Sequence, residues 1–512
     1  MATSAASSFT THDLAAVLFI GSLVLLISIL AVRFANRSGM PTLVLYLGIG
    51  LVMGEAGLGI HFENPELTQV LGYSALVLIL AEGGISTRWS GIRRSIAPAA
   101  VLSTLGVLVS VVTVAVFVAP LLGKSWTIAL LLGAIVTSTD AAAVFSVLKR
   151  VGLPRRLTGV LEAESGFNDA PVVLLVVALA TAATPGQTAH AWWVVTIEAV
   201  LELVGGAIIG LLLGWIFAHL SRRAAPGSSG LFSIGILAVT ILAYAAATLA
   251  HTSGFIAVYL AALVLGNSNL PHHRAVHGFA QSFGWLAQIG LFVLLGLLAS
   301  PSRLGSQVVP AIVVGLVLLL IARPLSVFAS LTWFRFSWRE QLFLSWAGLR
   351  GAVPVVLATV PLTVGTPRTE WIFDLVFVLV LVFTLVQALP MPWIARTLGL
   401  AESAQVIDLD VEATPLEELR ADVLQLHVGA TSRLNGVEIQ ELRLPEGANV
   451  TLIVRGDQGF VPTRRTVIRR GDQLLLVTTA GSREQAIRRV RSVSRDGRMA
   501  GWSTPWRTDS DQ

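Results

Sequence analysis

Residues 136–143 read VTSTDAAA, which places three hydroxyl side chains and Asp140 in the middle of a long apolar run. Hydroxyls in such a run either bond back to the carbonyls of an ordinary helix or satisfy the backbone where a transmembrane helix unwinds. Unwound helices form ion sites in transporters. A charge at mid-membrane depth costs at least about 2.5 kcal/mol, so an acid at that depth is a functional candidate by default. Asp140 therefore favours an ion site.

Long apolar runs make up most of the rest of the chain. The 512 residues are 54% hydrophobic and only 13% charged, whereas soluble domains carry about 25% charged residues. Because about 20 apolar residues cross a bilayer core, about 13 runs are predicted to be transmembrane helices of an all-α polytopic membrane protein. The runs lie near 14–32, 41–58, 69–86, 97–119, 126–148, 166–184, 192–219, 231–250, 254–266, 279–299, 309–330, 341–361 and 372–394.

Basic residues alternate between the connections of these runs and predict the orientation of the protein. Residues 1–13 contain no lysine or arginine, so 14–32 is interpreted as a true first span and not as a cleavable signal. Lysine and arginine are enriched in cytoplasmic loops, which places the N-terminus outside and residues 395–512 in the cytoplasm. The basic residues of the odd-numbered connections are Arg33, Arg37, Arg88, Arg93, Arg94, Lys149, Arg150, Arg155, Arg156, Arg222, Arg223, Arg274, Arg335 and Arg339. The even-numbered connections hold only Lys124, Arg303 and Arg368.

A second polar stretch, EAESGFNDAP at 162–171, is predicted to open the sixth span. Its carboxylate, hydroxyl and amide oxygens suit a hard monovalent cation, and a carboxylate can also carry a proton. Asn168 and Asp169 lie further into the run and indicate an ion site. Glu162 and Glu164 are interpreted as interfacial residues near a helix cap.

An arginine lies in a third polar stretch, GLRGAVP at 348–354. Flanking glycines and a nearby proline predict an unwound or kinked helix, in which Arg350 needs an acidic partner or free carbonyls. Residues 341–360 also resemble 129–148 in length and small-residue content, which is typical of inverted repeats with a site between them. Arg323 is expected either to pair in the same way or to extend to the cytoplasmic interface.

Other charged residues and glycines at membrane depth have two interpretations. Glu82 is either an interfacial charge at the end of the third span or part of the ion site. Glu198 and Glu202, one turn apart, favour a structural role. Three glycines of span seven are spaced four residues apart and predict a helix-packing surface: Gly206, Gly210 and Gly214.

Charge becomes dense from Glu402 onward, which marks a soluble domain. Val450–Val454 and Gln473–Val477 are predicted strands, each after a turn signal, and Ser482–Val493 has a helical basic pattern. The chain therefore divides into a transmembrane domain (1–400), a small cytoplasmic α+β domain (401–497) and a tail expected to be disordered (498–512).

Together these stretches resemble the bacterial monovalent cation:proton antiporter-1 family of sodium/proton and potassium/proton exchangers. The resemblance rests on Thr139-Asp140, ESGFND at 164–169 and GLRGAVP at 348–354, and it covers roughly residues 12–395. SGFIAVYLAALVLGN at 253–267 and WLAQIGLFVLLGLL at 285–298 resemble its potassium/proton branch. Residues 436–477 resemble the TrkA-C regulatory domain attached to some of these antiporters.

The resemblance implies about thirteen helices in two inverted repeats with discontinuous helices, a homodimer, and a core domain that moves against the dimer interface. The acid of the third span maps to Glu82 and the core arginine to Arg350. The implied ion site comprises Thr139, Asp140, Ser165, Asn168 and Asp169, with the monovalent cation on Asp169, Asp140, Ser165 and Thr139. Many sodium exchangers of the family have proline where this chain has Ala141, which leaves potassium and sodium both open. The TrkA-C resemblance implies a nucleotide-type ligand.

The interpretation is a secondary antiporter of the inner membrane that exchanges potassium or sodium for protons by competition at one mid-membrane carboxylate. A regulated cation channel is the alternative, although no carbonyl selectivity filter is present. GSSG at 227–230 with His251 fits a loose serine-protease pattern, but it follows Pro226 in a linker. Without a Walker loop or an HExxH motif, neither an enzyme nor a cofactor is expected. Nucleic acid is not an expected partner, because the arginines lie in loops between apolar runs.

Overall fold

The chain forms two compact units, Met1–Leu400 and Ala401–Gln512, which are described separately. Asp140 and the predicted tail at 498–512 lie outside the residues that the structure describes. The computed structural model describes residues 11–38, 40–55, 57–60, 64–139, 153–186, 192–223, 228–268, 270–400, 412–416, 421–429, 432–456, 458–479 and 481–497.

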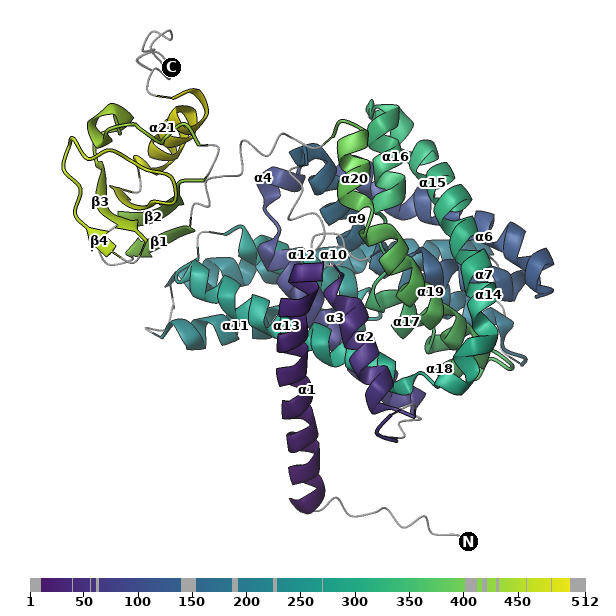
Figure 1. Cartoon of the computed structure of the whole chain (residues 1–512). Coiled ribbons are helices and arrows are strands. Elements are labelled where there is room, and N and C mark those ends of the chain that lie inside the picture. The colour runs from purple at the N-terminus through teal and green to yellow at the C-terminus, as the bar shows by residue number, and fades with distance from the viewer. Residues whose placement is uncertain are drawn as a thin grey trace. The chain divides into compact units, whose positions relative to one another are not determined.

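The first unit is helical throughout its described part (Figure 1). Its helices are α1 (Thr11–Ser38), α2 (Thr42–Met53), α3 (Pro65–Ser86), α4 (Trp89–Ile92), α5 (Ile96–Val101), the π-helical turn η1 (Leu102–Gly106), α6 (Val107–Leu122), α7 (Trp126–Thr137), α9 (Arg155–Ala183), α10 (Trp192–Arg223), α11 (Ser229–Leu249), α12 (Gly254–Gly266), α13 (His273–Leu298), α14 (Pro301–Val317), the π-helical turn η2 (Leu318–Ala322), α15 (Arg323–Leu331), the 3₁₀ turn η3 (Thr332–Phe334), α16 (Trp338–Ala347), α17 (Ala352–Leu357), α18 (Val360–Val364), α19 (Glu370–Ala388) and α20 (Met391–Thr397).

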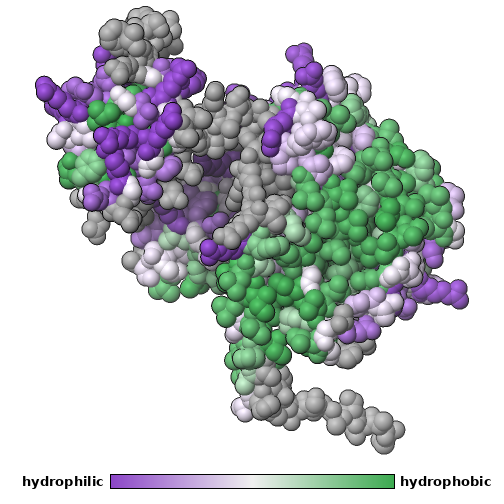
Figure 2. Space-filling model, viewed as in Figure 1, coloured by the Kyte–Doolittle hydropathy of each residue, from purple (hydrophilic) through white to green (hydrophobic). Residues whose placement is uncertain are grey.

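Hydropathy and length confirm a polytopic membrane protein. Within the described residues, nine helices are long and apolar enough to cross a membrane, and a tenth span forms if the bent pair Trp338–Ala347 and Ala352–Val364 is counted. Three shorter apolar helices, α2, α7 and α12, fall in the other predicted runs. Figure 2 shows hydrophobic residues gathered over the surface of these helices, as a lipid-facing surface requires.

Glycines allow several helices of this unit to pack with their backbones in contact. A Cβ atom at Gly210 would lie 2.4 Å from the carbonyl oxygen of Ala257, and one at Gly206 would lie 2.3 Å from that of Ser253. Both carbonyls lie at or near the start of α12, so the predicted packing surface of α10 is confirmed. The short run at 254–266 forms a single helix, α12, that lies against α3, α10 and α11.

The second unit is an antiparallel five-stranded sheet in the order β1-β2-β5-β3-β4, accompanied by helix α21 (Arg483–Asp496). The strands are β1 (Glu412–Leu416), β2 (Ala421–His427), β3 (Ala448–Arg455), β4 (Gln458–Phe460) and β5 (Gln473–Thr479). The two predicted strands and the predicted helix are confirmed as β3, β5 and α21. Leu424, Leu474 and Val490 lie in its hydrophobic core, where α21 covers the sheet.

Candidate functional site

Helix α7 ends at Thr137, within the apolar run that contains VTSTDAAA. Ser125 caps its start by accepting a hydrogen bond from the backbone N–H of Ile128. The last helical residue is Thr137, and Ser138 leaves the helix with φ −57° and ψ 139°. Ser138 and Thr139 are buried, as an unwound stretch inside a bundle must be when lipid cannot satisfy its backbone.

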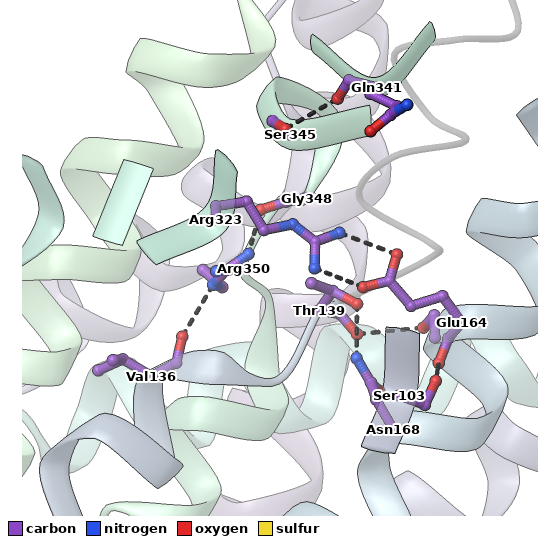
Figure 3. Close-up of polar contacts among 11 residues, drawn as sticks. Ser103, Val136, Thr139, Glu164, Asn168, Arg323, Gln341, Ser345, Gly348 and Arg350 are labelled. Atoms are coloured by element: carbon purple, nitrogen blue, oxygen red, sulfur yellow. Dashed lines mark hydrogen bonds and ion pairs between the residues drawn. The ribbon is translucent and has the colours of Figure 1, made fainter. Parts of the chain in front are cut away.

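Side chains of α9 satisfy this unwound stretch. The Ser138 hydroxyl donates to Oδ1 of Asp169 at 2.8 Å. The Ser165 hydroxyl donates to the carbonyl of Thr139 at 3.1 Å, and Nδ2 of Asn168 donates to Oγ1 of Thr139 at 2.6 Å (Figure 3). The four predicted site residues Thr139, Ser165, Asn168 and Asp169 therefore lie together.

The spacing of these residues explains why one helix can present them. Asn168 and Asp169 follow Ser165 by three and four residues, so both lie on the same face of α9 as Ser165. All three are at least nine-tenths buried. Oδ1 of Asn168 has no hydrogen-bond partner among the described residues, so this face of α9 carries a buried amide oxygen as well as the Asp169 carboxylate.

The predicted start of the sixth span is wrong. Helix α9 begins at Arg155, so the polar stretch 162–171 lies inside the helix and not at its opening. Charged and polar residues in the first turns of α9 lower its local hydropathy, and this displaced the predicted boundary. Pro171 lies within the helix, where it lacks the backbone N–H that would pair with the carbonyl four residues earlier.

An ion pair that the sequence did not assign adjoins this cluster. Glu164, interpreted as interfacial, is buried and pairs with the guanidinium of Arg323 through an ion-pair contact of 2.6 Å and a hydrogen bond of 2.8 Å (Figure 3). Of the two expectations for Arg323, pairing is therefore confirmed. The Ser103 hydroxyl, from η1, donates to the backbone carbonyl of Glu164 at 3.1 Å. Glu164 directly precedes Ser165 in the sequence, and this position could have identified it as a buried residue beside the cluster.

A broken helix crosses this region from the C-terminal half of the unit. Helices α16 and α17 are bent by 52° across the break that contains Arg350. Nε of Arg350 donates to the carbonyl of Val136 in the last turn of α7 at 2.8 Å, and the guanidinium also contacts the carbonyl of Gly348. Free carbonyls are thus the partners of Arg350. A Cβ atom at Gly348 would lie 2.6 Å from Nε of Arg323. The two arginines therefore connect this break to the end of α7 and to Glu164 of α9.

The remaining acids at membrane depth have different surroundings. Glu82 accepts a hydrogen bond from the Ser86 hydroxyl at 3.0 Å and packs against Gly284 of α13. None of the hydrogen bonds given above for α7 and α9 involves Glu82. Asp374 pairs with Arg303 at 3.2 Å near the start of α19. The backbone carbonyl of Glu202 accepts from the backbone N–H of Ser253, which joins α10 to α12.

The chemistry of the cluster is that of hard oxygen donors. It combines one carboxylate, several hydroxyls, a backbone carbonyl and an amide oxygen in a buried setting. No group of three or more His, Cys, Asp or Glu side chains that could hold a metal occurs within the described part of the chain. Such a site suits a weakly held monovalent cation or a proton better than a transition metal.

Known families match both units. The family described as sodium/hydrogen exchanger, transmembrane, matches residues 22–397. The TrkA-C domain family matches residues 423–491.

Several characterised proteins resemble the chain over most of its length. The K(+)/H(+) antiporter NhaP of Alkalimonas amylolytica is 37% identical over 467 residues, which are 90% of this chain and 80% of that protein. The K(+)/H(+) antiporter NhaP2 of Shewanella baltica (strain OS223) is 34% identical over 466 residues, with the same coverage. The structure of the sodium proton antiporter MjNhaP1 from Methanocaldococcus jannaschii at pH 8 superposes with a TM-score of 0.65 at 23% identity, covering 75% of this chain and 99% of the other.

Proposed function

The chain belongs to the transmembrane sodium/hydrogen exchanger family, and on this basis we propose that it is a secondary antiporter exchanging a monovalent cation for protons across the cell membrane. The observation that carries the proposal is the buried cluster in which the unwound end of α7 meets Asp169 of α9. The names of the relatives that are 34% and 37% identical favour potassium as the cation. A relative from Synechocystis sp., 29% identical over 74% of this chain, is named a Na(+)/H(+) antiporter, so sodium is the second candidate.

In the proposed mechanism, a proton and a cation compete for the Asp169 carboxylate. A neutral acid and a cation-paired carboxylate both avoid an unpaired charge in a low-dielectric interior, so only loaded forms of the site cross the membrane readily. Movement of the site between the two sides then couples the two fluxes without ATP. Thr139 and Ser165 contribute oxygens to the cation, and the Ser138 hydroxyl holds the carboxylate in place.

Three further residues have proposed roles that support the cluster. Asp140 directly follows Thr139 in the sequence and supplies a second carboxylate to the cation. Asn168 orients Thr139 through its amide nitrogen. Arg350 donates to a carbonyl in the buried last turn of α7 and thereby compensates the negative end of that helix dipole. Glu82 is proposed to act on the ion path and not in the central cluster.

The organisation around the site is also a proposal. Residues 1–400 carry transport in the inner membrane with the N-terminus outside, and 401–497 form a cytoplasmic regulatory domain. Unequal binding of a nucleotide-type ligand to two transport states would bias the cycle through this domain. A homodimer is proposed because the family resemblance implies one. A regulated channel is the weaker candidate, since the relatives are named antiporters.

The test is a proteoliposome assay with an internal pH-sensitive dye. Adding potassium, sodium or lithium outside an acid-loaded vesicle is expected to produce proton efflux that depends on the cation. The Asp169→Asn variant is the matched control, because an amide of nearly the same shape cannot carry the exchanged proton. Cation current without proton movement in the parent protein would identify a channel and contradict antiport.

Removing the second unit separates transport from regulation. A protein truncated after residue 400 is expected to insert and to exchange cations with an altered dependence on pH or cation concentration. Unchanged dependence on both, together with no response of the full-length protein to cytosolic nucleotides, would show that 401–497 has no regulatory role.

A further inference from the structure

One face of α9 carries two acids separated by a glycine. Glu162, Gly166 and Asp169 follow one another by four and three residues, so they lie in a row on the helix. At 1.5 Å per residue, Glu162 is about 10 Å from Asp169 along the helix axis. Asp169 is buried, whereas Glu162 is only partly buried. An ion that reaches Asp169 from the end where α9 begins therefore passes Gly166.

The ring of Tyr259, from α12, occupies the space over Gly166. A Cβ atom at Gly166 would lie 2.4 Å from Cζ and 2.8 Å from the hydroxyl oxygen of Tyr259. The ring also packs edge-to-face on Phe167, with centroids 5.9 Å apart. No side chain other than hydrogen fits between α9 and this ring. The phenol therefore fills the interval between Glu162 and Asp169.

The hydroxyl of Tyr259 has no hydrogen-bond partner in the described part of the chain, although the side chain is almost fully buried. Buried tyrosine hydroxyls ordinarily find a partner, because an unpaired polar group costs its lost hydration. Thr87 is close enough to the phenol to pair weakly with it, but its hydroxyl donates to the carbonyl of Gly83 at 2.7 Å, and no hydrogen bond of normal geometry reaches the Tyr259 hydroxyl within the described residues. The carboxylate of Glu162 also lies within electrostatic range of the phenol.

The helix that carries Tyr259 is held closely on its other sides. A Cβ atom at Gly84 of α3 would lie 2.7 Å from the backbone carbonyl of Tyr259. A Cβ atom at Gly210 of α10 would lie 2.4 Å from the carbonyl oxygen of Ala257, two residues earlier in α12. Because α12 cannot retreat without separating these backbones, the way to Asp169 opens only when the ring rotates or α9 slides past it.

We propose that Tyr259 gates the ion path between Glu162 and Asp169, and that its hydroxyl oxygen is a transient ligand of the passing cation. The inference rests on the proposed antiport function and adds a residue to it. An oxygen that is buried without a partner while the path is closed gains one when a partly dehydrated cation passes. The phenol then replaces part of the hydration that the cation loses.

The test compares Tyr259→Phe with Tyr46→Phe in the full-length protein. Tyr46 of α2 is an apt control because its hydroxyl is also buried without a hydrogen-bond partner in the structure described. Cation-dependent proton efflux is measured in proteoliposomes over a range of potassium and sodium concentrations, and melting temperature is measured in detergent. For Tyr259→Phe we expect the half-saturating cation concentration to rise about 3- to 10-fold, as for the loss of one hydrogen bond. Tyr46→Phe is expected to match the parent.

Each outcome of this comparison is decisive. Equal half-saturation in Tyr259→Phe and the parent would overturn the ligand role, as would an equal change in Tyr46→Phe. A parent that exchanges no cation would overturn the antiport function and this inference together. A parent that exchanges while Asp169→Asn does not, with Tyr259→Phe unchanged, would overturn this inference alone.

A second pair of variants tests the gate even if Tyr259→Phe fails to fold. Gly166→Ala places a methyl group where the ring lies, so exchange is expected to slow at least 10-fold. Adding Tyr259→Leu to Gly166→Ala makes room for that methyl group and is expected to recover part of the rate. Full activity of Gly166→Ala, or no recovery in the double variant, would show that the ring is not a gate.

Discussion

The buried ion pair of Glu164 and Arg323 should contribute strongly to the stability of the transmembrane unit. The Arg323 and Glu164 side chains are 4% and 3% exposed, and an ion-pair contact of 2.6 Å and a hydrogen bond of 2.8 Å join them. Glu164→Gln leaves the arginine charged and buried without a counter-charge, which costs about 3–5 kcal/mol. Total stabilities are about 5–15 kcal/mol, so the loss should be large enough to lower the melting temperature visibly.

A double-mutant cycle isolates the pair itself. Glu164→Gln and Arg323→Gln are each expected to destabilise the protein, whereas the double variant should lose less than the sum of the two, by about 1–3 kcal/mol. Arg339→Gln is the matched control, because Arg339 is exposed and lies over the Trp338 ring at 5.5 Å. Its removal should cost no more than about 1 kcal/mol.

The assay is reversible unfolding in mixed detergent micelles, followed by tryptophan fluorescence. Additive losses in the double variant would show that the charges do not interact. Single variants as stable as Arg339→Gln would show that the pair is hydrated, which would contradict the burial reported for both side chains.

Three further changes have defined outcomes. Asp169→Asn should abolish cation-dependent proton efflux with little change in melting temperature; residual exchange at the parent's rate would exclude Asp169 as the carrier. Gly348→Ala should destabilise the unit by about 1–3 kcal/mol, because the new methyl group would lie 2.6 Å from Nε of Arg323; a melting temperature equal to the parent's would mean that this contact is loose. Although burial acts to raise the pKa of Asp472, hydrogen bonds from the Arg455 side chain and the Arg469 backbone outweigh it and hold this pKa below its ordinary value. Because the pKa of Asp472 is lower in the folded than in the unfolded protein, its ionised carboxylate stabilises the fold at pH values above the unfolded pKa of about 3.9. This stabilisation is lost as the pH falls through the pKa of the folded state. Hydrogen exchange of the β5 amides is measured in the full-length protein and corrected for intrinsic rates; their protection should decrease below about pH 4. In Asp472→Asn this decrease should be smaller. An equal decrease in both proteins would contradict the lowered pKa of Asp472.

The amino-acid sequence by itself determined the membrane class, and it singled out four candidate site residues that the structure places together: Thr139, Ser165, Asn168 and Asp169. The free energy of transferring a segment into lipid depends on the residues of that segment alone. Apolar runs therefore predict transmembrane helices, and helices occur at the predicted spans. Acids within such runs are costly enough to be functional candidates, so Asp169 was predicted as a candidate without knowledge of its neighbours. The strands β3 and β5 were predicted because their turn signals and β-branched residues are also local.

The partners of the buried charges were decided by the tertiary structure. Glu164 and Arg323 are 159 residues apart in the chain, and Arg350 meets the carbonyl of Val136 across 214 residues. On a hydropathy scale, a charged residue makes burial in the membrane unfavourable whatever its partner. For this reason Glu164 was assigned to the interface, and the start of α9 was predicted too late in the sequence. Inside the helix bundle, a counter-charge or a free carbonyl from a distant segment offsets that cost. Only the packing of α9 on α15, and of the break between α16 and α17 on the end of α7, brings these partners within hydrogen-bonding distance.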